Sequence, residues 1–378
     1  MFTLQEALKA LEEKTEFSVK DRGEYIVIDY NISFKETFIG RTDEETNILL
    51  NLRGTAFDKI SGKIIRLGWP KFHNWGEFPE SDKKLDFSKP HTITQKLDGS
   101  CIFPIYMPDG SYELGTRAGI TDVSKMADRW MKSNENRFGA YDRFIKTCQR
   151  NNVTPIFEYC SRENRVVLDF PETKMVLTGA RWMYDGSYID RDRLIIISDH
   201  FHIPLVSQQS SSTNESFTSL RKYVGDLVGD EGIVIQFEDG HMIKIKSDDY
   251  CLKHKALDSL KFEKDVLLLA LEGKIDDVLP LLDDSAKKRV QSHTDAFLAA
   301  YIATTKLIAT AYEQVGNIES QKEFAFEIQD SKFKSFMFAY RGRKTEFADS
   351  LLEHCKKGCG TQERAKEMKE LLSFSEVY

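Results

Sequence analysis

The sequence predicts an α+β protein in which a domain of antiparallel sheets with flanking helices is followed by an all-α C-terminal domain. From about residue 20 to about residue 250, short apolar or alternating runs are separated by turn signals, which is typical of strands. These turn signals include Pro108-Asp109-Gly110, Tyr184-Asp185-Gly186 and Glu238-Asp239-Gly240. Beyond about residue 252 the apolar residues follow a helical period instead. We therefore predict two domains, residues 1–252 and residues 253–378.

Helices are predicted at both ends of the chain. A short helix is expected within residues 1–20, because apolar residues recur there at helical spacing. They are Phe2, Leu4, Ala7, Leu8 and Leu11. In the C-terminal domain only Pro280 interrupts the helical pattern. The segments expected to be helical there are residues 265–271, 286–314, 322–338, 345–356 and 362–372.

The composition indicates an ordinary globular protein. The chain has 378 residues, 41% hydrophobic and 30% charged, which is enough for two domains. No apolar stretch approaches the roughly 20 residues that cross a bilayer, and the first 20 residues carry four glutamates, so we expect a cytoplasmic protein without a membrane segment. The formal charge of −7 argues against a protein that coats nucleic acid nonspecifically, but it leaves room for a local basic groove.

The six cysteines are too sparse for a disulfide scaffold, so free thiols in a reducing compartment are expected. Two of them, Cys355 and Cys359, follow His354 in a short run near the end of the chain. A zinc site needs about four ligands at suitable spacing. No second pair of ligands lies nearby in the sequence, so this run does not by itself predict a metal site.

The central signal for chemistry is the segment Gln95-Lys96-Leu97-Asp98-Gly99-Ser100. Taken alone, Lys-x-Asp-Gly also fits a surface β-turn, because Asp-Gly is a common turn dipeptide. Three further segments follow it in a fixed order: Phe157-Glu158-Tyr159, Asp230-Glu231-Gly232-Ile233-Val234-Ile235 and Met242-Ile243-Lys244-Ile245-Lys246. Each could be an ordinary strand or turn, and the last an edge strand whose lysines discourage aggregation. Their combination at these spacings indicates a catalytic site.

These residue types suit phosphoryl transfer. An exposed lysine has a pKa near 10.4, whereas an amine attacks phosphorus only when it is deprotonated. Neighbouring Lys244, Lys246 and a bound Mg²⁺ would disfavour a further positive charge at Lys96. Because side chains alternate along a strand, Lys244 and Lys246 project from the same face and can converge on one phosphate. Mg²⁺ prefers oxygen ligands, so Glu158 and Glu231 are candidates to hold it.

With these segments the sequence resembles the covalent nucleotidyltransferase superfamily of ATP-dependent ligases and capping enzymes. It is most similar to the phage RNA ligase 1 family, the tRNA-repairing branch. Further marks of this family are Leu52-Arg53-Gly54-x-x-Phe57, Lys71-Phe72-His73-Asn74, Asn164-Arg165-Val166-Val167, Ser247-Asp248-Asp249-Tyr250 and Glu272-Gly273-x-x-Asp276-Asp277. The resemblance runs from about residue 50 to about residue 280. It departs at His73, where the family has a second Phe, and at Arg162, where it has Pro.

The resemblance implies an ATP-grasp-like nucleotidyltransferase fold for residues 1–252. It also implies a role for each residue that matches a motif of the family. The residues implied in catalysis are Lys96, which would carry AMP, with Asp98, Lys244 and Lys246. Those implied in nucleotide binding are Arg53, Lys71, Gln95, Lys96, Gly99, Arg117, Phe157, Glu158, Glu231, Lys244 and Lys246. Those implied near Mg²⁺ or Mn²⁺ are Glu158, Glu231, Tyr250 and Asp276. For Arg117, a solvated turn arginine is an equally good interpretation.

The activity implied by the resemblance is ATP-dependent RNA ligation through lysyl-AMP and an RNA-adenylate. The RNA ends would carry a 5′-phosphate and a 3′-hydroxyl, and the RNA would be a cleaved tRNA. A polynucleotide kinase and 3′-phosphatase would prepare those ends, in a host bacterial cytoplasm if the chain is encoded by a bacteriophage. We expect a monomer, and the helical C-terminal domain is expected to provide RNA specificity.

Other functions fit part of this pattern. A DNA ligase or an mRNA capping enzyme shares the lysine chemistry, but both normally append an OB barrel of five short strands. The sequence after about residue 250 indicates helices instead. A noncatalytic RNA-binding relative would keep the fold and lose the reactive residues, whereas each residue needed for lysine adenylylation is present here.

Overall fold

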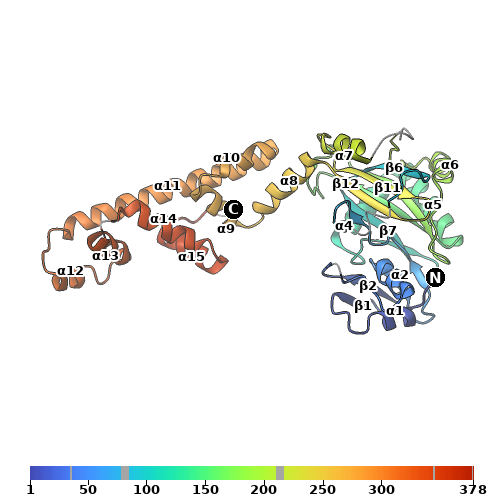
Figure 1. Ribbon diagram of the computed structural model, residues 1–378, viewed down its shortest axis with the longest axis horizontal. Helices are drawn as coiled ribbons and strands as arrows, with labels where there is room; N and C mark the ends of the chain where they lie inside the picture. Colours follow the sequence, from blue (N-terminus) through green and yellow to red (C-terminus); the bar gives the residue numbers. More distant parts are fainter. Residues whose placement is uncertain (35, 78–84, 210–216, 344, 377) are drawn as a thin grey trace. The chain divides into compact units, whose positions relative to one another are not determined.

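The computed structural model describes residues 1–34, 36–77, 85–209, 217–343, 345–376 and 378. By their internal contacts, the residues divide into two compact units, Met1–Cys251 and Leu252–Tyr378. The first unit holds the strands and the second consists of helices (Figure 1). The predicted α+β class, with antiparallel sheets followed by a helical C-terminal part, is confirmed. Within the described residues, no helix is both long and apolar enough to cross a membrane.

The first unit begins with a helix that packs on a four-stranded antiparallel sheet. The order of this sheet is β1-β2-β3-β4. Its strands are β1 (Phe17–Asp21), β2 (Tyr25–Tyr30), β3 (Thr55–Asp58) and β4 (Ile64–Arg66). The helix α1 (Leu4–Ala10) starts with a capping box between Thr3 and Glu6. It is shorter than the sequence suggested, because the chain leaves the helix after Ala10 and enters β1 at Phe17.

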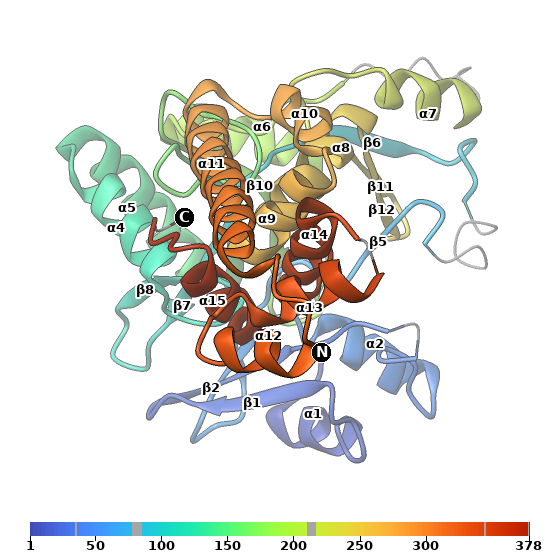
Figure 2. The same cartoon turned by 90° about the vertical axis from the view of Figure 1, so that its left-hand side faces the viewer.

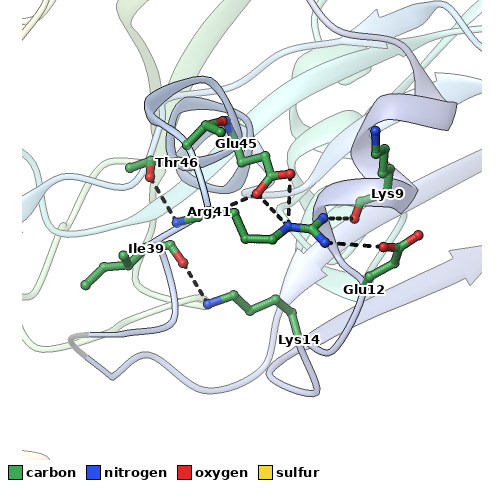
Figure 3. Close-up of polar contacts among 9 residues, drawn as sticks. Lys9, Glu12, Lys14, Ile39, Arg41, Glu45 and Thr46 are labelled. Atoms are coloured by element: carbon green, nitrogen blue, oxygen red, sulfur yellow. Dashed lines mark hydrogen bonds and ion pairs between the residues drawn. The ribbon is translucent and has the colours of Figure 1, made fainter.

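A short polar cluster holds the segment before α2 (Asp43–Asn51) against α1 (Figure 3). The Arg41 side chain donates to Glu45 and to the carbonyl oxygen of Lys9, and it forms an ion pair with Glu12. Lys14 Nζ donates to the carbonyl oxygen of Ile39 at 2.9 Å. These groups are largely exposed, so the cluster fixes the local geometry more than it stabilises the fold.

The second sheet of the first unit has the order β10-β9-β7-β8. Its strands are β7 (Ser100–Tyr106), β8 (Tyr112–Gly115), β9 (Val153–Cys160) and β10 (Lys174–Trp182). The helices that accompany it are α4 (Asp122–Lys132), α5 (Glu135–Arg150) and α6 (Arg191–Phe201). Its main core forms where Phe144 of α5 and Phe157 of β9 pack together, with ring centroids 6.1 Å apart.

The third sheet has the order β5-β12-β11-β6. Its strands are β5 (His73–Asn74), β6 (His91–Lys96), β11 (Gly232–Phe237) and β12 (Met242–Lys246). All pairs are antiparallel except the short β12–β5 pair. Isoleucines of β6, β11 and β12 pack with the helix α7 (Phe217–Gly225) in one apolar cluster. The alternating pattern of these strands therefore leaves their polar side chains on the opposite face.

The second unit is built around one long helix, α11 (Asp284–Val315), which Figures 1 and 2 show with shorter helices along it. The shorter helices are α9 (Glu263–Leu271), α10 (Ile275–Val278), α12 (Gln321–Glu327), α13 (Lys334–Arg343), α14 (Phe347–Gly358) and α15 (Gln362–Leu371). The helix α8 (Asp248–Ser259) begins in the first unit and continues into the second. Pro280 lies in a one-turn 3₁₀ helix. The segment 322–338, expected as a single helix, is two helices separated at residues 328–333.

Gly232, the first residue of β11, lies between β6 and β12 in the third sheet, next to the lysines of the predicted site. Its backbone pairs with Lys96 on one side and with Lys246 on the other. Paired residues on adjacent strands project from the same face, so a side chain at Gly232 would stand between the two lysines. Gly232 has φ +140°, and a Cβ there would lie 2.0 Å from the carbonyl oxygen of Ile245. The position therefore requires glycine on two grounds.

We predict that Gly232→Ala destabilises the protein by about 2 kcal/mol or more, because the methyl group collides with backbone and the φ angle is strained. The matched control is Gly110→Ala, which has φ +84° but nothing within 4 Å of the added Cβ, and should cost about 1 kcal/mol. Chemical denaturation monitored by circular dichroism measures both. Equal losses for the two variants would contradict the steric argument.

Candidate active site

A cavity of about 870 Å³ lies between the second and third sheets. Its walls include residues of β6 and β11 on one side, and residues of β7, β9 and β10 on the other. Five of the residues predicted to bind a nucleotide line it: Arg53, Gln95, Lys96, Gly99 and Glu158. A volume of this size is in the range of small-molecule sites. The predicted site residues in this group therefore line one open cavity.

Lys96 ends β6 and extends toward a carboxylate at the start of the next strand. Its Nζ lies 2.7 Å from Oε2 of Glu231, the residue directly before β11. The other oxygen, Oε1, lies 3.3 Å from Nζ of Lys246 on β12. Glu231 is buried, with 4% of its side chain exposed, so its charge is compensated by the two lysines it joins.

This ion pair bears on how Lys96 could act as a nucleophile. An ammonium group has no free electron pair, so attack by Lys96 requires that it separate from Glu231 and lose a proton. The sequence pattern suggested only that neighbouring cations surround Lys96. The structure adds a carboxylate in direct contact, which no spacing rule in the sequence indicated.

Lys244 is the cation of the site whose protonation is most perturbed. Burial lowers the pKa of Lys244 to about 8, and the positive charges of Lys96, Lys71, Arg53 and Lys246 act in the same direction. Its Nζ also lies 5.4 Å from the centre of the Phe72 ring. Near pH 8 a substantial fraction of Lys244 is therefore neutral, which makes it a chemical competitor of Lys96.

Glu158 faces the cavity from β9. Burial raises the pKa of the Glu158 carboxyl to about 7, and the charges of Glu231 and Asp98 act in the same direction. Lys96 and Arg53 oppose this shift. A carboxyl group near half-ionisation at neutral pH, in a cavity with a lysine and an arginine, is typical of a functional site.

Asp98 is buried beneath the Lys96 segment and orders it. Its carboxylate accepts hydrogen bonds from the backbone N–H groups of Val167 at 2.9 Å and Leu168 at 2.7 Å, and from the Tyr250 hydroxyl at 2.8 Å. Gly99 fits closely beside it, because a Cβ there would be 2.5 Å from the carbonyl oxygen of Tyr159. The Lys-x-Asp-Gly turn is thus held by backbone and side-chain contacts from three segments.

The basic residues expected at the phosphates occupy different surroundings. Arg53 lines the cavity. Lys71 lies with Nζ 5.5 Å from the Tyr30 ring centre, outside the cavity lining, although its charge acts on Lys244. Arg117 forms a 3.1 Å ion pair with Asp29 and stacks on Tyr30. Arg117 thus has an acidic partner while 39% of its side chain is exposed, and its assignment to the phosphates stays a prediction.

Gln95 and Phe157 illustrate two different outcomes. The Gln95 amide donates to Asp230 at 2.6 Å and accepts from the Ser207 hydroxyl at 3.1 Å, so it fixes the cavity wall next to Lys96. Phe157 is fully buried and contacts Tyr141 and Phe144 in the core. Since neighbouring side chains on β9 point to opposite faces, Glu158 points to the cavity and Phe157 away from it. The Phe157 side chain therefore belongs to the core, and a part for this residue in nucleotide binding stays a prediction.

Two residues predicted near a metal need separate comment. Tyr250 is 2% exposed and its hydroxyl donates to Asp98, so its contacts favour ordering of Asp98 over direct contact with a metal. Asp276 is an exposed residue of α10 in the second unit, and its role stays a prediction. Within the described part of the chain, no group of three or more His, Cys, Asp or Glu side chains could hold a metal ion by itself.

Sequence reasoning missed several residues of this region. Asp29 and Tyr30 of β2 contact Arg117, and Trp69 and Tyr188 line the cavity with ring centroids 5.6 Å apart. Asp29 is 4% exposed and follows a run of apolar residues, and such an acid in an otherwise buried strand was the available signal. The two aromatic residues carried no comparable signal.

Comparison with known proteins identifies the class to which this fold and site belong. Residues 51–266 match the RNA ligase family of the T4 RNA ligase 1 type. This match spans more than half of the chain, so the chain belongs to this family and is an RNA ligase.

Individual relatives are distant in sequence. A protein of Thermovibrio ammonificans named "Putative RNA ligase" is 25% identical over 340 residues, covering 85% of this chain and 84% of that protein. An archaeal ATP-dependent RNA ligase structure aligns with 98% of this chain and 79% of its own, with 12% identity and a TM-score of 0.47. A Naegleria gruberi RNA ligase variant with ATP and Mn aligns with 50% of this chain and 58% of its own, with 15% identity and a TM-score of 0.39.

We predict that Glu158→Gln is more stable than the wild-type protein at pH 8, by on the order of 2 kcal/mol. The pKa of Glu158 is about 7 in the folded protein and near 4.5 when unfolded, so ionisation of the folded form carries a cost that is fully present above pH 7. The difference should shrink as the pH falls through this window and vanish below about pH 4.5.

Thermal unfolding of both proteins between pH 4.5 and 8 measures this difference. Glu113→Gln, at an exposed position of β8, is the control and should not alter the pH profile. An equal or lower stability of Glu158→Gln at pH 8 would show that the carboxylate is well stabilised in the cavity.

Proposed function

We propose that this RNA ligase uses ATP to adenylylate Lys96 and then seals RNA ends that carry a 5′-phosphate and a 3′-hydroxyl. The observation that carries the proposal is the position of Lys96. Lys96 lines the cavity, and its Nζ contacts the carboxylate that also binds Lys246. Arg53 and Glu158 line the same cavity. A reactive amine with fixed cations around it suits a reaction in which negative charge develops on a phosphoryl group.

The first step is attack of the neutral Lys96 amine on the α-phosphorus of ATP. A nitrogen–phosphorus bond forms, the bond to the bridging oxygen breaks, and pyrophosphate leaves with that electron pair. The amine proton passes to solvent. If a divalent cation arrives with the nucleotide and binds Glu231, Lys96 loses its anionic partner and gains a positive neighbour, and both changes would favour the neutral amine.

Two further displacements at phosphorus complete ligation. The 5′-phosphate of one RNA end attacks lysyl-AMP, forms a phosphoanhydride with AMP and frees Lys96. The 3′-hydroxyl of the other end then attacks the 5′-phosphate, a phosphodiester forms, and AMP leaves while the hydroxyl proton passes to solvent. Because each step transfers charge among phosphate oxygens, the same cations, Lys244 and Lys246, can serve all three.

A divalent cation fits the donor set only in combination with the substrate. Mg²⁺ keeps several waters and is usually bound by one or two carboxylates together with phosphates. Glu158 and Glu231 supply such carboxylates at the cavity, and both influence each other electrostatically. When bound there, Mg²⁺ or Mn²⁺ would neutralise phosphate charge. We assign Asp276 to the same task from the family resemblance alone.

The RNA partner is proposed from the family resemblance and from the secondary structure of the second unit. The described residues of that unit form helices joined by turns and loops, and they include no strand of an OB barrel. We propose that it recognises a folded RNA such as a cleaved tRNA, and that a polynucleotide kinase and 3′-phosphatase prepares the ends. Competition between 5′-phosphorylated single-stranded RNA and nicked duplex DNA tests this, and equal sealing of both would refute it.

We predict that incubation with labelled ATP and Mg²⁺ labels the wild-type protein covalently and leaves Lys96→Ala unlabelled. Glu231→Ala and Lys246→Ala should each reduce labelling at least about 100-fold, because Glu231 is proposed to help hold the divalent cation and Lys246 to stabilise the charge on the transferring phosphoryl group. Lys63→Ala, at an exposed position, should label like the wild type.

Labelled protein is measured after denaturing electrophoresis, and circular dichroism checks that each variant is folded. Label on Lys96→Ala equal to that on the wild type would refute the proposed nucleophile. Near-normal labelling of folded Lys246→Ala would place the phosphate-binding wall elsewhere.

A further inference from the structure

Arg66 of β4 is a completely buried arginine without a carboxylate partner among the described residues. Its exposed fraction is 0%, and burial lowers the pKa of its guanidinium to about 10. The guanidinium carbon lies 4.6 Å from the centre of the Phe103 ring. A buried charge is costly unless its donors are satisfied, so the groups that Arg66 binds are of interest.

The donors of Arg66 bind the backbone of two separate loops. Nε donates to the carbonyl oxygen of Gly54 at 2.8 Å, and one terminal nitrogen donates to the same oxygen. The other terminal nitrogen donates to the carbonyl oxygen of Thr116 at 3.0 Å. The terminal nitrogen that binds Gly54 also makes a weaker contact of 3.5 Å with the carbonyl oxygen of Arg117. A single guanidinium therefore joins the loop after α2 to the loop after β8.

The two loops are also in direct contact at Gly54. Gly54 has φ +73°, and a Cβ there would lie 2.5 Å from the carbonyl oxygen of Arg117. The two backbones thus approach as closely as glycine allows. A shift of one loop cannot occur without a shift of the other.

Each loop carries a basic residue of the site directly next to the anchored carbonyl group. Arg53 precedes Gly54 and lines the cavity. Arg117 follows Thr116 and is held by its ion pair with Asp29. Arg53 and Arg117 both act electrostatically on Asp29, so the two side chains belong to one charged region.

We infer that Arg66 is a positioning residue for ATP: it holds the Arg53 and Arg117 loops at the separation that the phosphates of the nucleotide require. This inference rests on the proposed function, because it assigns these arginines to the nucleotide. Arg66 touches no substrate itself. Lysine cannot replace it, since a single ammonium group lacks the planar fork that reaches carbonyl groups on two loops at once.

The inference predicts a difference between two partial reactions. The β- and γ-phosphates are present in ATP but absent from a pre-adenylylated RNA. Arg66→Lys should therefore raise the ATP concentration for half-maximal adenylylation about tenfold, the effect expected when a charged group loses hydrogen bonds of ~1.4 kcal/mol. Sealing of a pre-adenylylated RNA should change less than about threefold. A purely structural lesion would impair both reactions alike.

A double-mutant cycle with Arg53→Ala tests whether Arg66 acts through Arg53. If it does, Arg66→Lys in the Arg53→Ala background should change the half-saturating ATP concentration less than about twofold. The matched control is Phe144→Leu, a buried core change on α5 that contacts neither loop in the described structure. Phe144→Leu should leave the half-saturating ATP concentration unchanged, both in the wild-type protein and in Arg53→Ala.

Three outcomes would decide the matter. Full additivity of Arg66→Lys with Arg53→Ala, or equal losses in adenylylation and sealing, would overturn the positioning role. If Arg66→Lys does not fold, Phe103→Leu takes its place in the same cycle, because it removes the ring that packs on the guanidinium and leaves the charge satisfied. Labelling of the wild-type protein with ATP is the control for the proposed function. If the wild-type protein takes no label, the proposed function is refuted; if only the Arg66 result fails, the positioning role alone is refuted.

Discussion

The site depends on one buried carboxylate placed between two lysines whose strands, β6 and β12, flank β11 on either side. Glu231 binds Lys96 with one oxygen and Lys246 with the other, directly before the strand whose first residue, Gly232, pairs with both lysines. The absence of a side chain at Gly232 lets the two lysine chains approach the same point. The register of β11 with its two partner strands and the glycine at position 232 therefore determine where Lys96 and Lys246 meet.

The first unit buries charged groups at a cost in stability. Burial raises the pKa of Glu158 and lowers those of Lys244 and Arg66, so each of these groups is held in a state that water would stabilise better. The surrounding sheets, with apolar clusters on their opposite faces, supply the stabilisation that offsets this cost. Such opposition between site and fold is common in enzymes, where groups are arranged for reaction and not for maximal stability.

Much of the fold followed from the sequence because its signals are local. Alternating runs with Asp-Gly turns indicated antiparallel sheets, and helical periodicity after about residue 252 indicated the helical part. The residues at which helices begin and end were harder to predict from the sequence. Nothing local shows that α1 stops at Ala10, or that the segment from 322 to 338 breaks into two helices. These boundaries depend on packing between segments that are distant in the sequence.

The side-chain environment of the site was only partly accessible from the sequence. Motif spacing gathered Lys96, Glu158 and Glu231, but it did not indicate that Glu231 contacts Lys96 directly. The alternation of β9 places Phe157 in the core, a consequence that follows once Glu158 is assigned to the cavity. Arg66 had no motif to mark it, since its role comes from two loops that meet only in the folded chain.

The most direct test of the central claim is to identify the lysine that carries AMP. Lys96 and Lys244 are both close to the cavity, and the lowered pKa of Lys244 makes it the alternative nucleophile on chemical grounds. Wild-type protein treated with ATP and Mg²⁺ can be digested and its modified peptide mapped by mass spectrometry. We predict the adduct on Lys96, and an adduct on Lys244 or on any other lysine would contradict the account.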